Sequence, residues 1–451
     1  MLDSEESNSL LINRRTAEID DFRRFNTGTK NFDKQFCSIY LARLAALKDT
    51  LVARARQKWG SRPILQVDSL SEFGVLGEEG PIILVGTLYK HQELKPSILK
   101  ELSDEIQSAN QPMRSNYSSD KDKLFIEDEV LRAKLVGHHP NHTELVTGLV
   151  CAVLGHGTED GAFWVEDWCF PGCCPQISSA EISGGDRGKL LLVSGLDIAT
   201  SAECMSLDLL GEWIGGLAGV PNAQREEATV MQVIVAGNSV RATVETRTSR
   251  AYDAKKEHQA ASALESLVAT HKFDNFLGAL VENCSVIVMP GEFDPTDHSL
   301  PQQPLHPCML PKSSRYKSLR CVTNPWIGKL GDRIIAGSSG QPIEDITKVA
   351  GLEEATVLDW LERTLLWRHY APTAPDTLPA YPYFGSDPFV MKECPDIYFA
   401  GNTDEYSTKL YIGEEGQKVR LICIPKFAKT ETAVIVDLNS LDAWPISFGS
   451  S

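Results

Sequence analysis

The chain has 451 residues, of which 42% are hydrophobic and 23% charged, so its composition is that of an ordinary folded protein and excludes global disorder. At roughly 100 to 200 residues per domain, the length predicts two to four domains. Its 61 acidic and 44 basic residues give a net charge of −17, which argues against nucleic acid as the main partner and favours protein.

The first half of the chain predicts a helix followed by a small β-barrel. Residues 1–30 are polar and poorly patterned, which predicts a flexible tail. An amphipathic helix is expected next, because apolar residues recur at three- and four-residue steps: Phe36, Ile39, Tyr40, Leu44, Leu47 and Leu51. The β-rich runs that follow are Ile82–Tyr89, Leu124–Val136, Leu145–Leu154 and Phe163–Phe170, with a short helix around Ile98–Ile106. This pattern predicts an OB-type domain over residues 31–178, with a generic β-domain as the alternative.

The second half predicts a layered α/β domain. A Ser- and Gly-rich linker is expected at residues 179–188, and the domain at 189–451. Its apolar runs are Leu190–Ser194, Val230–Ala236, Val286–Met289, Arg333–Ile335 and Ile397–Ala400. Helical patterns cover Tyr252–Glu282 and Leu352–Trp367, and alternating runs close the chain at Leu410–Ile412, Val419–Ile424 and Ala433–Val436. Strands that are apolar throughout are buried on both faces, so the whole chain is expected to be an α+β multi-domain protein.

Ligands of an open α/β sheet gather where its strands end, so the loops after those five apolar runs are the candidate site. The loops resemble the metal-binding loops of a metallophosphoesterase in which the expected ligand positions have been replaced. Those positions are Gly195 and Asp197, Asn238, Glu292, Phe293 and Asp294, and Asn402 and Asp404. The loop Gly337–Gly340 also lacks histidine.

None of the ten histidines lies in these loops, whereas a two-metal hydrolase activates water only between cations held by a full set of ligands. The sequence therefore predicts a vestigial phosphoesterase site with no catalytic residue, no metal and no cofactor. The alternative is an unusual metal held by Asp197, Glu292, Asp294 and Asp404, in a manganese-dependent phosphodiesterase or nuclease.

Two further groups of residues allow functional alternatives. A zinc site would be built from thiolate and imidazole ligands, which the chain offers in Cys169, Cys173, Cys174, His138, His139 and His142. The adjacent cysteines lack the usual two-residue spacing of zinc ligands, which favours structural roles. Trp164 and Trp168 are predicted on one face of a strand, where they would stack on single-stranded nucleic acid or pack in a core or protein interface. The acidic neighbours Glu166 and Asp167 favour packing.

Cysteine usage and hydropathy indicate the compartment. Eleven cysteines without regular spacing favour reduced thiols over a disulfide framework. The acidic start does not resemble a secretory signal, and no run of 18 apolar residues occurs. We therefore expect a soluble intracellular protein.

Several longer motifs carry a family resemblance. They are Val288–Thr296, Leu300–Met309, Ala371–Leu378, Glu393–Pro395, Pro445–Phe448 and, in the first domain, Pro96–Leu99. These runs closely resemble the small regulatory subunits (subunit 2, or B-subunits) of DNA polymerase delta. The resemblance extends from about Phe36 to Phe448 and so covers almost the whole chain.

This resemblance implies an OB domain fused to an inactivated calcineurin-like phosphoesterase domain. It implies a scaffold in nuclear DNA replication and repair, which holds the C-terminal metal-binding region of the catalytic subunit and the N-terminal domain of a third subunit. That third subunit engages the sliding clamp, so the clamp is an indirect partner, and DNA is touched at most weakly. The family has no catalytic residues to transfer.

Overall fold

The computed structural model of the chain describes residues 14, 16, 18–28, 30–65, 67, 80–95, 116–138, 140–177, 187–200, 205–218, 221–241, 252–352 and 354–449, with the backbone alone at 221–223 and 252–264. The short helix expected around Ile98–Ile106, the motif at 96–99, His139 and most of the expected linker lie outside these residues. The chain forms two compact units. We name them the barrel unit (residues 29–175 and 342–393) and the sandwich unit (residues 1–28, 176–341 and 394–451).

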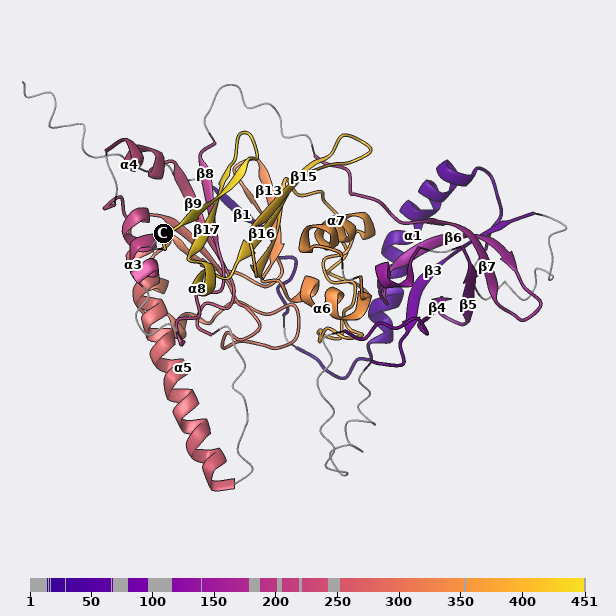
Figure 1. The fold of residues 1–451 in the computed structure, drawn as a ribbon, viewed down its shortest axis with the longest axis horizontal. Coiled ribbons are helices and arrows are strands. Elements are labelled where there is room, and N and C mark those ends of the chain that lie inside the picture. Colours follow the sequence, from indigo (N-terminus) through magenta and orange to yellow (C-terminus); the bar gives the residue numbers. More distant parts are fainter. Residues whose placement is uncertain are drawn as a thin grey trace, which may run out of the picture. The chain divides into compact units, whose positions relative to one another are not determined.

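The barrel unit contains one closed β-barrel (Figure 1). Its strands are β2 (Ile64–Leu65), β3 (Ile82–His91), β4 (Lys123–Glu127), β5 (Arg132–Gly137), β6 (Val150–Gly157) and β7 (Phe163–Cys169). The order is β2-β3-β4-β5-β7-β6, and pairing of β3 with β6 closes the barrel. β5 and β7 run parallel, whereas the neighbours of β4 and β6 are antiparallel. The closed ring thus has five strands, β3 to β7, and β2 pairs with β3 in addition. A five-stranded closed barrel with this Greek-key order is an OB barrel.

The sequence predicted Leu124–Val136 as one run, but the structure divides it into β4 and β5. The reason is Asp128, whose carboxylate Oδ1 accepts the backbone N–H groups of Val130 and Leu131, both at 2.9 Å. An aspartate that bonds the backbone two and three residues on forms a tight turn. The two strands therefore pair as a hairpin.

The predicted amphipathic helix is confirmed as α1 (Cys37–Trp59). Its buried residues are Ile39, Arg43, Leu47, Leu51 and Ala55, which recur every four residues along one face. Leu47, Leu51 and Ala55 pack against apolar residues of β3 and β6 in one core cluster. The helix thus covers one side of the barrel.

Residues 342–393 belong to the barrel unit, although the sequence predicted them within the α/β domain at 189–451. They include most of α6 (Gln341–Ala350) and all of α7 (Val357–Trp367), which begins at a capping box of Thr356 and Asp359, so that Leu352 precedes the helix. The buried Arg43 of α1 explains the difference. Its guanidinium donates to the Pro372 and Ala374 carbonyls at 2.9 and 2.7 Å, a contact between distant parts of the chain that no local pattern encodes.

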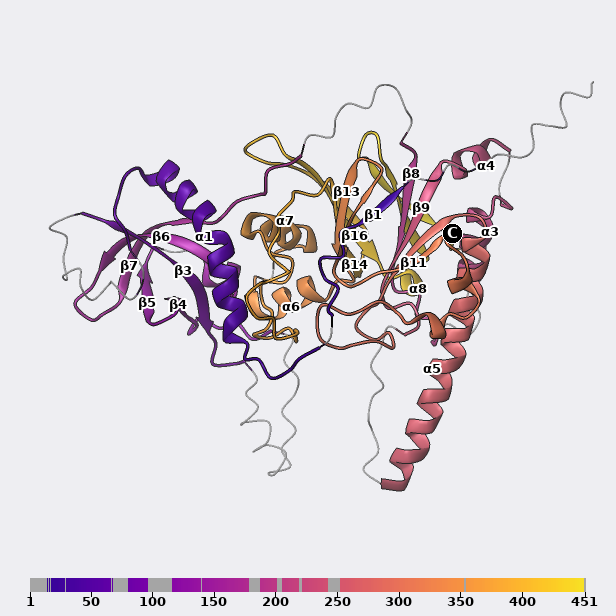
Figure 2. The same cartoon turned by 180° about the vertical axis from the view of Figure 1, so that it is seen from behind.

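The sandwich unit contains two six-stranded sheets (Figures 1 and 2). The first has the order β11-β10-β9-β8-β17-β18, with β11 (Leu319–Cys321), β10 (Ser285–Met289), β9 (Val230–Ala236), β8 (Lys189–Val193), β17 (Thr432–Asp437) and β18 (Ala443–Ser447). The second has the order β1-β12-β13-β14-β16-β15, with β1 (Ile19–Asp21), β12 (Trp326–Leu330), β13 (Arg333–Ser338), β14 (Ile397–Thr403), β16 (Lys418–Pro425) and β15 (Ser407–Ile412). Parallel strands form the centre of both sheets.

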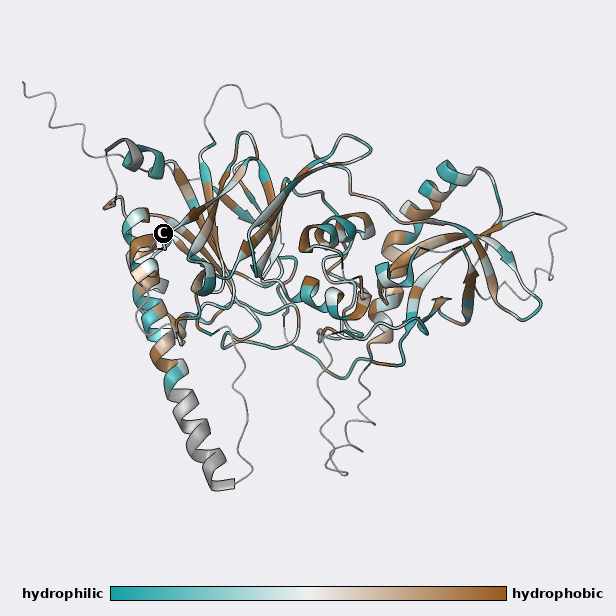
Figure 3. Cartoon of the chain, in the orientation of Figure 1, coloured by the Kyte–Doolittle hydropathy of each residue, from teal (hydrophilic) through white to brown (hydrophobic). Residues whose placement is uncertain are grey.

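Side-chain alternation along each central strand separates two cores. Leu190 and Leu192 of β8 face the core between the sheets, which contains Ile335 and Phe399 of the second sheet. The alternate residues of the same strand lie in the core that α3 (Met205–Ile214) and α5 (Tyr252–Val281) cover. Figure 3 shows hydrophobic residues along both sheets. The predicted layered α/β arrangement is thus a helix layer on two stacked, mixed sheets.

The N-terminal segment departs from the predicted flexible tail wherever the structure describes it. β1 pairs antiparallel with β12 at the edge of the second sheet. Phe25 is 1% exposed, and its carbonyl accepts a hydrogen bond from Gln303 Nε2 at 3.1 Å. A three-residue strand is too short to show an alternating pattern, so its pairing depends on a distant partner.

The remaining elements are short: α4 (Pro221–Glu227), α8 (Phe427–Thr430), and three single turns of 3₁₀ helix, η2 (His142–Glu144), η3 (Pro307–Met309) and η4 (Ser313–Arg315). Among the described residues, no helix has the length and apolar character needed to cross a membrane.

Candidate functional site

The five predicted loops meet in the sandwich unit, at the ends of parallel strands in both sheets. Asn402, near the end of β14, joins them. Its Nδ2 donates to the Ala236 carbonyl at 3.2 Å and to the Ser339 carbonyl at 2.7 Å. Its backbone N–H donates to Ser194 Oγ at 2.9 Å. Through its backbone and side-chain N–H groups, this one residue therefore contacts three other strand ends.

Glycines bring these loops into backbone contact. A Cβ added at Gly195 would lie 2.8 Å from Asn402 Oδ1, and one added at Gly237 would lie 2.4 Å from Ser339 Cβ. Both glycines have positive φ, at 63° and 82°. Because side chains are strained in that conformation and a Cβ would collide, both positions require glycine. The centre of the loop cluster is closely packed.

Asp294 serves as an acceptor for the backbone. Its Oδ2 accepts N–H groups from Gly291 at 2.8 Å and Ser239 at 3.3 Å, and its Oδ1 accepts that of Val240 at 2.8 Å. The side chain is 3% exposed. Burial raises the pKa of Asp294, and the hydrogen bonds from Val240 and Gly291 oppose that shift. This carboxylate ties the loop after β10 to the loop after β9.

The neighbouring loop positions have similar internal roles. Asn238 Oδ1 accepts a hydrogen bond from the Phe293 N–H at 3.2 Å. Asn238 also packs against Gly291, because a Cβ added to Gly291 would lie only 2.2 Å from Asn238 Oδ1. Phe293 is half-buried, and Glu292 is exposed. The structure thus brings Asn238, Phe293 and Asp294 together through backbone hydrogen bonds.

The four carboxylates of the alternative metal site are not brought together. Asp197 is buried, whereas Glu292 is exposed. Asp404 has a 75% exposed side chain that pairs with Lys426 at 3.2 Å and Lys429 at 3.6 Å, and the Lys426 ammonium lowers the pKa of Asp404. Among the described residues, no group of three or more His, Cys, Asp or Glu is arranged to hold a metal ion. The geometry of the described residues therefore does not support the alternative set of ligands.

A buried amide network that the sequence did not predict lies beside these loops. Asn324 Nδ2 donates to Gln302 Oε1 at 2.8 Å, Ser339 Oγ at 2.8 Å and Gln341 Oε1 at 2.7 Å. Gln302 Nε2 in turn donates to the Gly291 carbonyl at 2.9 Å. Neutral amides in irregular segments follow no hydrophobic period, so the sequence offered only their positions beside Pro301 and Pro325 as a signal.

The candidate zinc residues of the barrel unit have other neighbours. Cys169, Cys173 and Cys174 are buried, and Cys174 Sγ donates to the Met391 carbonyl at 3.2 Å. His138 is exposed, and His142 begins the turn η2. These observations favour structural roles for the thiols.

The expectation that Trp164 and Trp168 share one strand face is wrong. The pairing of β6 with β7 shifts between Leu154 and Gly155, so Glu166 is an extra residue on β7. A bulge of this kind reverses the alternation of side chains beyond it. Trp164 is consequently 41% exposed, whereas Trp168 is 8% exposed and donates from Nε1 to the His138 carbonyl at 3.2 Å.

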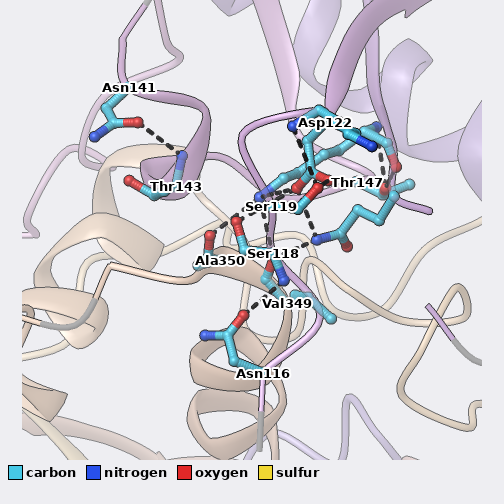
Figure 4. Close-up of polar contacts among 12 residues, drawn as sticks. Asn116, Ser118, Ser119, Asp122, Asn141, Thr143, Thr147, Val349 and Ala350 are labelled. Carbon is cyan, nitrogen blue, oxygen red and sulfur yellow. Dashed lines mark hydrogen bonds and ion pairs between the residues drawn. The ribbon is translucent and has the colours of Figure 1, made fainter. Parts of the chain in front are cut away.

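A second polar cluster, in the barrel unit, surrounds a buried lysine. Lys90 Nζ donates to the Val349 and Ala350 carbonyls, both at 3.1 Å, and lies 3.5 Å from Asp122 Oδ2. These two carbonyls lie at the C-terminal end of α6, where the helix dipole attracts a cation. Asp122 also accepts hydrogen bonds from Ser118 and Ser119 (Figure 4). Burial lowers the pKa of Lys90 to about 8, although Asp122 opposes the shift.

This pKa predicts a specific pH dependence. Between about pH 8 and 10.5 the unfolded chain holds a proton on Lys90 that the folded chain has lost, so stability rises with pH across that window. The free energy of unfolding of the wild type, minus that of Lys90→Met, is expected to increase by up to about 1.4 kcal/mol per pH unit. Denaturant unfolding at a series of pH values measures this slope. Lys121→Met, which removes an exposed lysine from the turn beside Asp122, is the control.

The chain also matches known proteins over almost its full length. Residues 35–168 match the family model described as DNA polymerase delta subunit OB-fold domain. Residues 190–409 match the family model of the B-subunits of DNA polymerase alpha/epsilon. The first match confirms the predicted OB domain.

Individual relatives agree with these models. The chain is 40% identical to DNA polymerase delta subunit 2 of Drosophila melanogaster, over 93% of this chain and 94% of that protein. It is 38% identical to the DNA polymerase delta small subunit of Oryza sativa subsp. japonica, over 98% and 99%. The small subunit of Saccharomyces cerevisiae is 30% identical, over 92% and 89%. The chain therefore belongs to the family of small (second) subunits of DNA polymerase delta.

Proposed function

We propose that this chain is a non-catalytic scaffold of the polymerase delta complex in nuclear DNA replication and repair. It binds the C-terminal metal-binding region of the catalytic subunit and a third, clamp-binding subunit, and so connects the two. The names of its relatives support an accessory role, because they are subunits of a polymerase. The acidic net charge of −17 supports protein partners over direct contact with DNA.

The sandwich unit is, on this proposal, a calcineurin-like phosphoesterase domain that has lost its chemistry. The observation that carries the proposal is the engagement of Asn402, Asn238 and Asp294 in hydrogen bonds to backbone groups of neighbouring loops. Water activation by two metals needs lone pairs that are directed at the cations. Here backbone N–H groups use lone pairs of Asp294 and Asn238, and Asn402 meets the backbone with the N–H groups of its amide. Gly195 has no side chain to offer.

The mechanism of such a scaffold is geometric. If one body holds the catalytic chain and a clamp-binding chain together, clamp binding becomes intramolecular, and a linked second site acts at an effective concentration that reaches the millimolar range. A permanent interface of this class buries on the order of 2,000 Å² or more. Large apolar side chains that remain exposed on the barrel unit, such as Phe32 and Phe384, are available for such contacts.

Co-expression tests the proposal. The catalytic chain, the third subunit and this chain are expected to purify together in equal amounts, and the third subunit should be lost from the catalytic chain when this chain is omitted. A catalytic chain without its C-terminal region serves as the control and should retain neither of the other two. A direct complex of the third subunit with the catalytic chain alone would contradict the linking role.

A further inference from the structure

An exposed apolar surface lies on the barrel unit where the chain enters α1. Four large apolar side chains form it: Phe32 is 66% exposed, Phe36 47%, Leu41 38% and Phe384 69%. We name these four residues the aromatic strip. Single exposed apolar residues are common, but a cluster with three phenylalanines leaves a large apolar area in water. Such clusters mark interaction sites.

Inner aromatic rings hold the outer ones in place. The Phe32 ring meets the Tyr381 ring edge-on at 5.4 Å, and the Asn31 N–H donates to the Tyr381 hydroxyl at 2.7 Å. Tyr381 contacts Tyr383 at 4.9 Å, and Tyr383 contacts the fully buried Phe389 at 6.5 Å. The strip is therefore anchored to the core of the unit. Anchored aromatic side chains lose little entropy on binding, which is a property of interface hot spots.

The first turns of α1 continue the strip. Cys37, Leu41 and Ala45 are all exposed and follow one another at four-residue steps, so they line one side of the helix. A solvent-facing stripe of this kind is usually polar. Because Cys37 and Ala45 are small, a second helix can approach α1 closely on either side of Leu41.

A cation beside the strip indicates the chemistry at the flank of the partner. The exposed Lys34 ammonium lies 4.9 Å from the centroid of the Phe384 ring, at the edge of the apolar surface. The chain as a whole is acidic, with a net charge of −17, so a lysine at this place is the less common charge. Complementarity therefore favours a partner with a carboxylate beside its apolar face.

We propose that the aromatic strip is the docking surface for an amphipathic α-helix of another polymerase delta subunit. The helix lays its apolar face along α1, between Phe32 and Leu41, and places an acidic residue near Lys34. This inference rests on the proposed scaffold function and adds to it the location of one contact and the chemistry of the segment that makes it.

The test uses the full chain with the catalytic chain and the third subunit. A double variant, Phe32→Ser with Phe384→Ser, is expected to weaken binding of one of these subunits by at least about tenfold, because hot-spot aromatics dominate interface affinity. Lys34→Glu should weaken the same contact more at low salt than at high salt, because salt screens the added repulsion. Dissociation constants are measured with purified subunits.

The control is the double variant Met205→Ser with Leu217→Ser, which removes two apolar side chains of the sandwich unit that are 76% and 77% exposed. It should leave both affinities unchanged. Thermal unfolding of both double variants should match the wild type, because the replaced side chains are exposed.

Several outcomes would overturn the inference. Equal binding of both subunits by the strip variant and the wild type would show that the strip is not the docking surface, while the scaffold function would stand. A wild-type dimer in light scattering that the strip variant abolishes, with both subunits still bound, would assign the strip to a second copy of this chain. A wild-type chain that binds neither subunit would contradict the scaffold function and the helix partner with it.

Discussion

Replacing Arg43 with methionine is expected to destabilise the chain by about 3–5 kcal/mol, the loss typical when one partner of a buried ion pair is removed. Arg43 and Asp387 are both buried, and the guanidinium Nε donates to the Asp387 carboxylate at 2.7 Å. Nη1 and Nη2 donate to three backbone carbonyls, those of Gly148, Pro372 and Ala374. Methionine fills similar space but leaves a buried carboxylate and three carbonyls without these donors.

The loss of stability caused by Arg43→Met should be smaller at about pH 5 than at about pH 7. His369 Nε2 lies 2.9 Å from Asp387 Oδ2. Burial, together with the positive charge of Arg43, lowers the pKa of His369 to about 4. Without Arg43 that pKa rises, so a protonated His369 can replace the arginine as counterion of Asp387 when the pH falls. In the wild type the same depressed pKa makes stability fall from pH 6.5 towards 4, because only the unfolded chain then takes up the proton.

Denaturant unfolding of Arg43→Met at the two pH values measures both effects. The control is Arg56→Met, which removes an exposed arginine from the same helix and should stay within about 0.5 kcal/mol of the wild type. A loss in Arg43→Met no greater than that of the control would mean that the ion pair contributes little. A loss that is the same at both pH values would exclude His369 as the substitute cation.

The sequence predicted the helices and strands whose apolar residues recur at short, regular steps along the chain. Alternating and continuous apolar runs located the barrel strands and the central strands of both sheets, because side chains two residues apart share a strand face. Four-residue steps located α1 in the same way. Contacts between distant segments were not predictable. A charged residue of an amphipathic helix usually faces solvent. Arg43 instead binds carbonyls more than 300 residues away, in the segment 342–393 that belongs to the barrel unit.

The candidate site was predictable in place but not in detail. The carboxyl ends of parallel strands lie at the same edge of a sheet, and from this rule the sequence predicted that Asn238, Asp294 and Asn402 belong to one group of loops. Which polar group each side chain contacts depends on backbone geometry, such as the positive φ of Asn238 and Asn402 at 52° and 57°. The sequence therefore suggested four carboxylates as metal ligands, whereas Asp294 binds backbone N–H groups and Asp404 pairs with lysines.

Asp294 is consequently expected to matter for stability and not for hydrolysis. Replacing it with alanine leaves the N–H groups of Gly291, Ser239 and Val240 without their acceptor in a buried site. Each unsatisfied buried donor costs about 1–3 kcal/mol, so the loss should be about 3 kcal/mol or more. Asp294→Asn should lie between alanine and the wild type, because the amide retains one accepting oxygen but turns its NH₂ group towards a donor.

The pH dependence gives an independent check on this role. Burial raises the folded-state pKa of Asp294 above 3.8, so the folded chain binds a proton more tightly than the unfolded chain. As the pH rises above 3.8, the wild type therefore loses stability relative to Asp294→Ala. The difference in the free energy of unfolding between the two proteins should be larger at about pH 4 than at about pH 7. Asp208→Asn, a change at an exposed carboxylate of α3 in the same unit, is the control and should leave the free energy of unfolding at pH 7 within about 0.5 kcal/mol of the wild type.

Hydrolysis separates the structural role from a catalytic one. Wild type and Asp294→Ala, both free of contaminating nuclease, are expected to show the same background hydrolysis of a phosphodiester with and without added Mn²⁺. If the wild type hydrolysed the substrate only with Mn²⁺ and Asp294→Ala lost that activity while remaining folded, the carboxylate would be a metal ligand. Since three backbone N–H groups already occupy its oxygens in the folded chain, a metal at this position would have to displace those hydrogen bonds. Loss of stability without any change in hydrolysis is therefore the expected result.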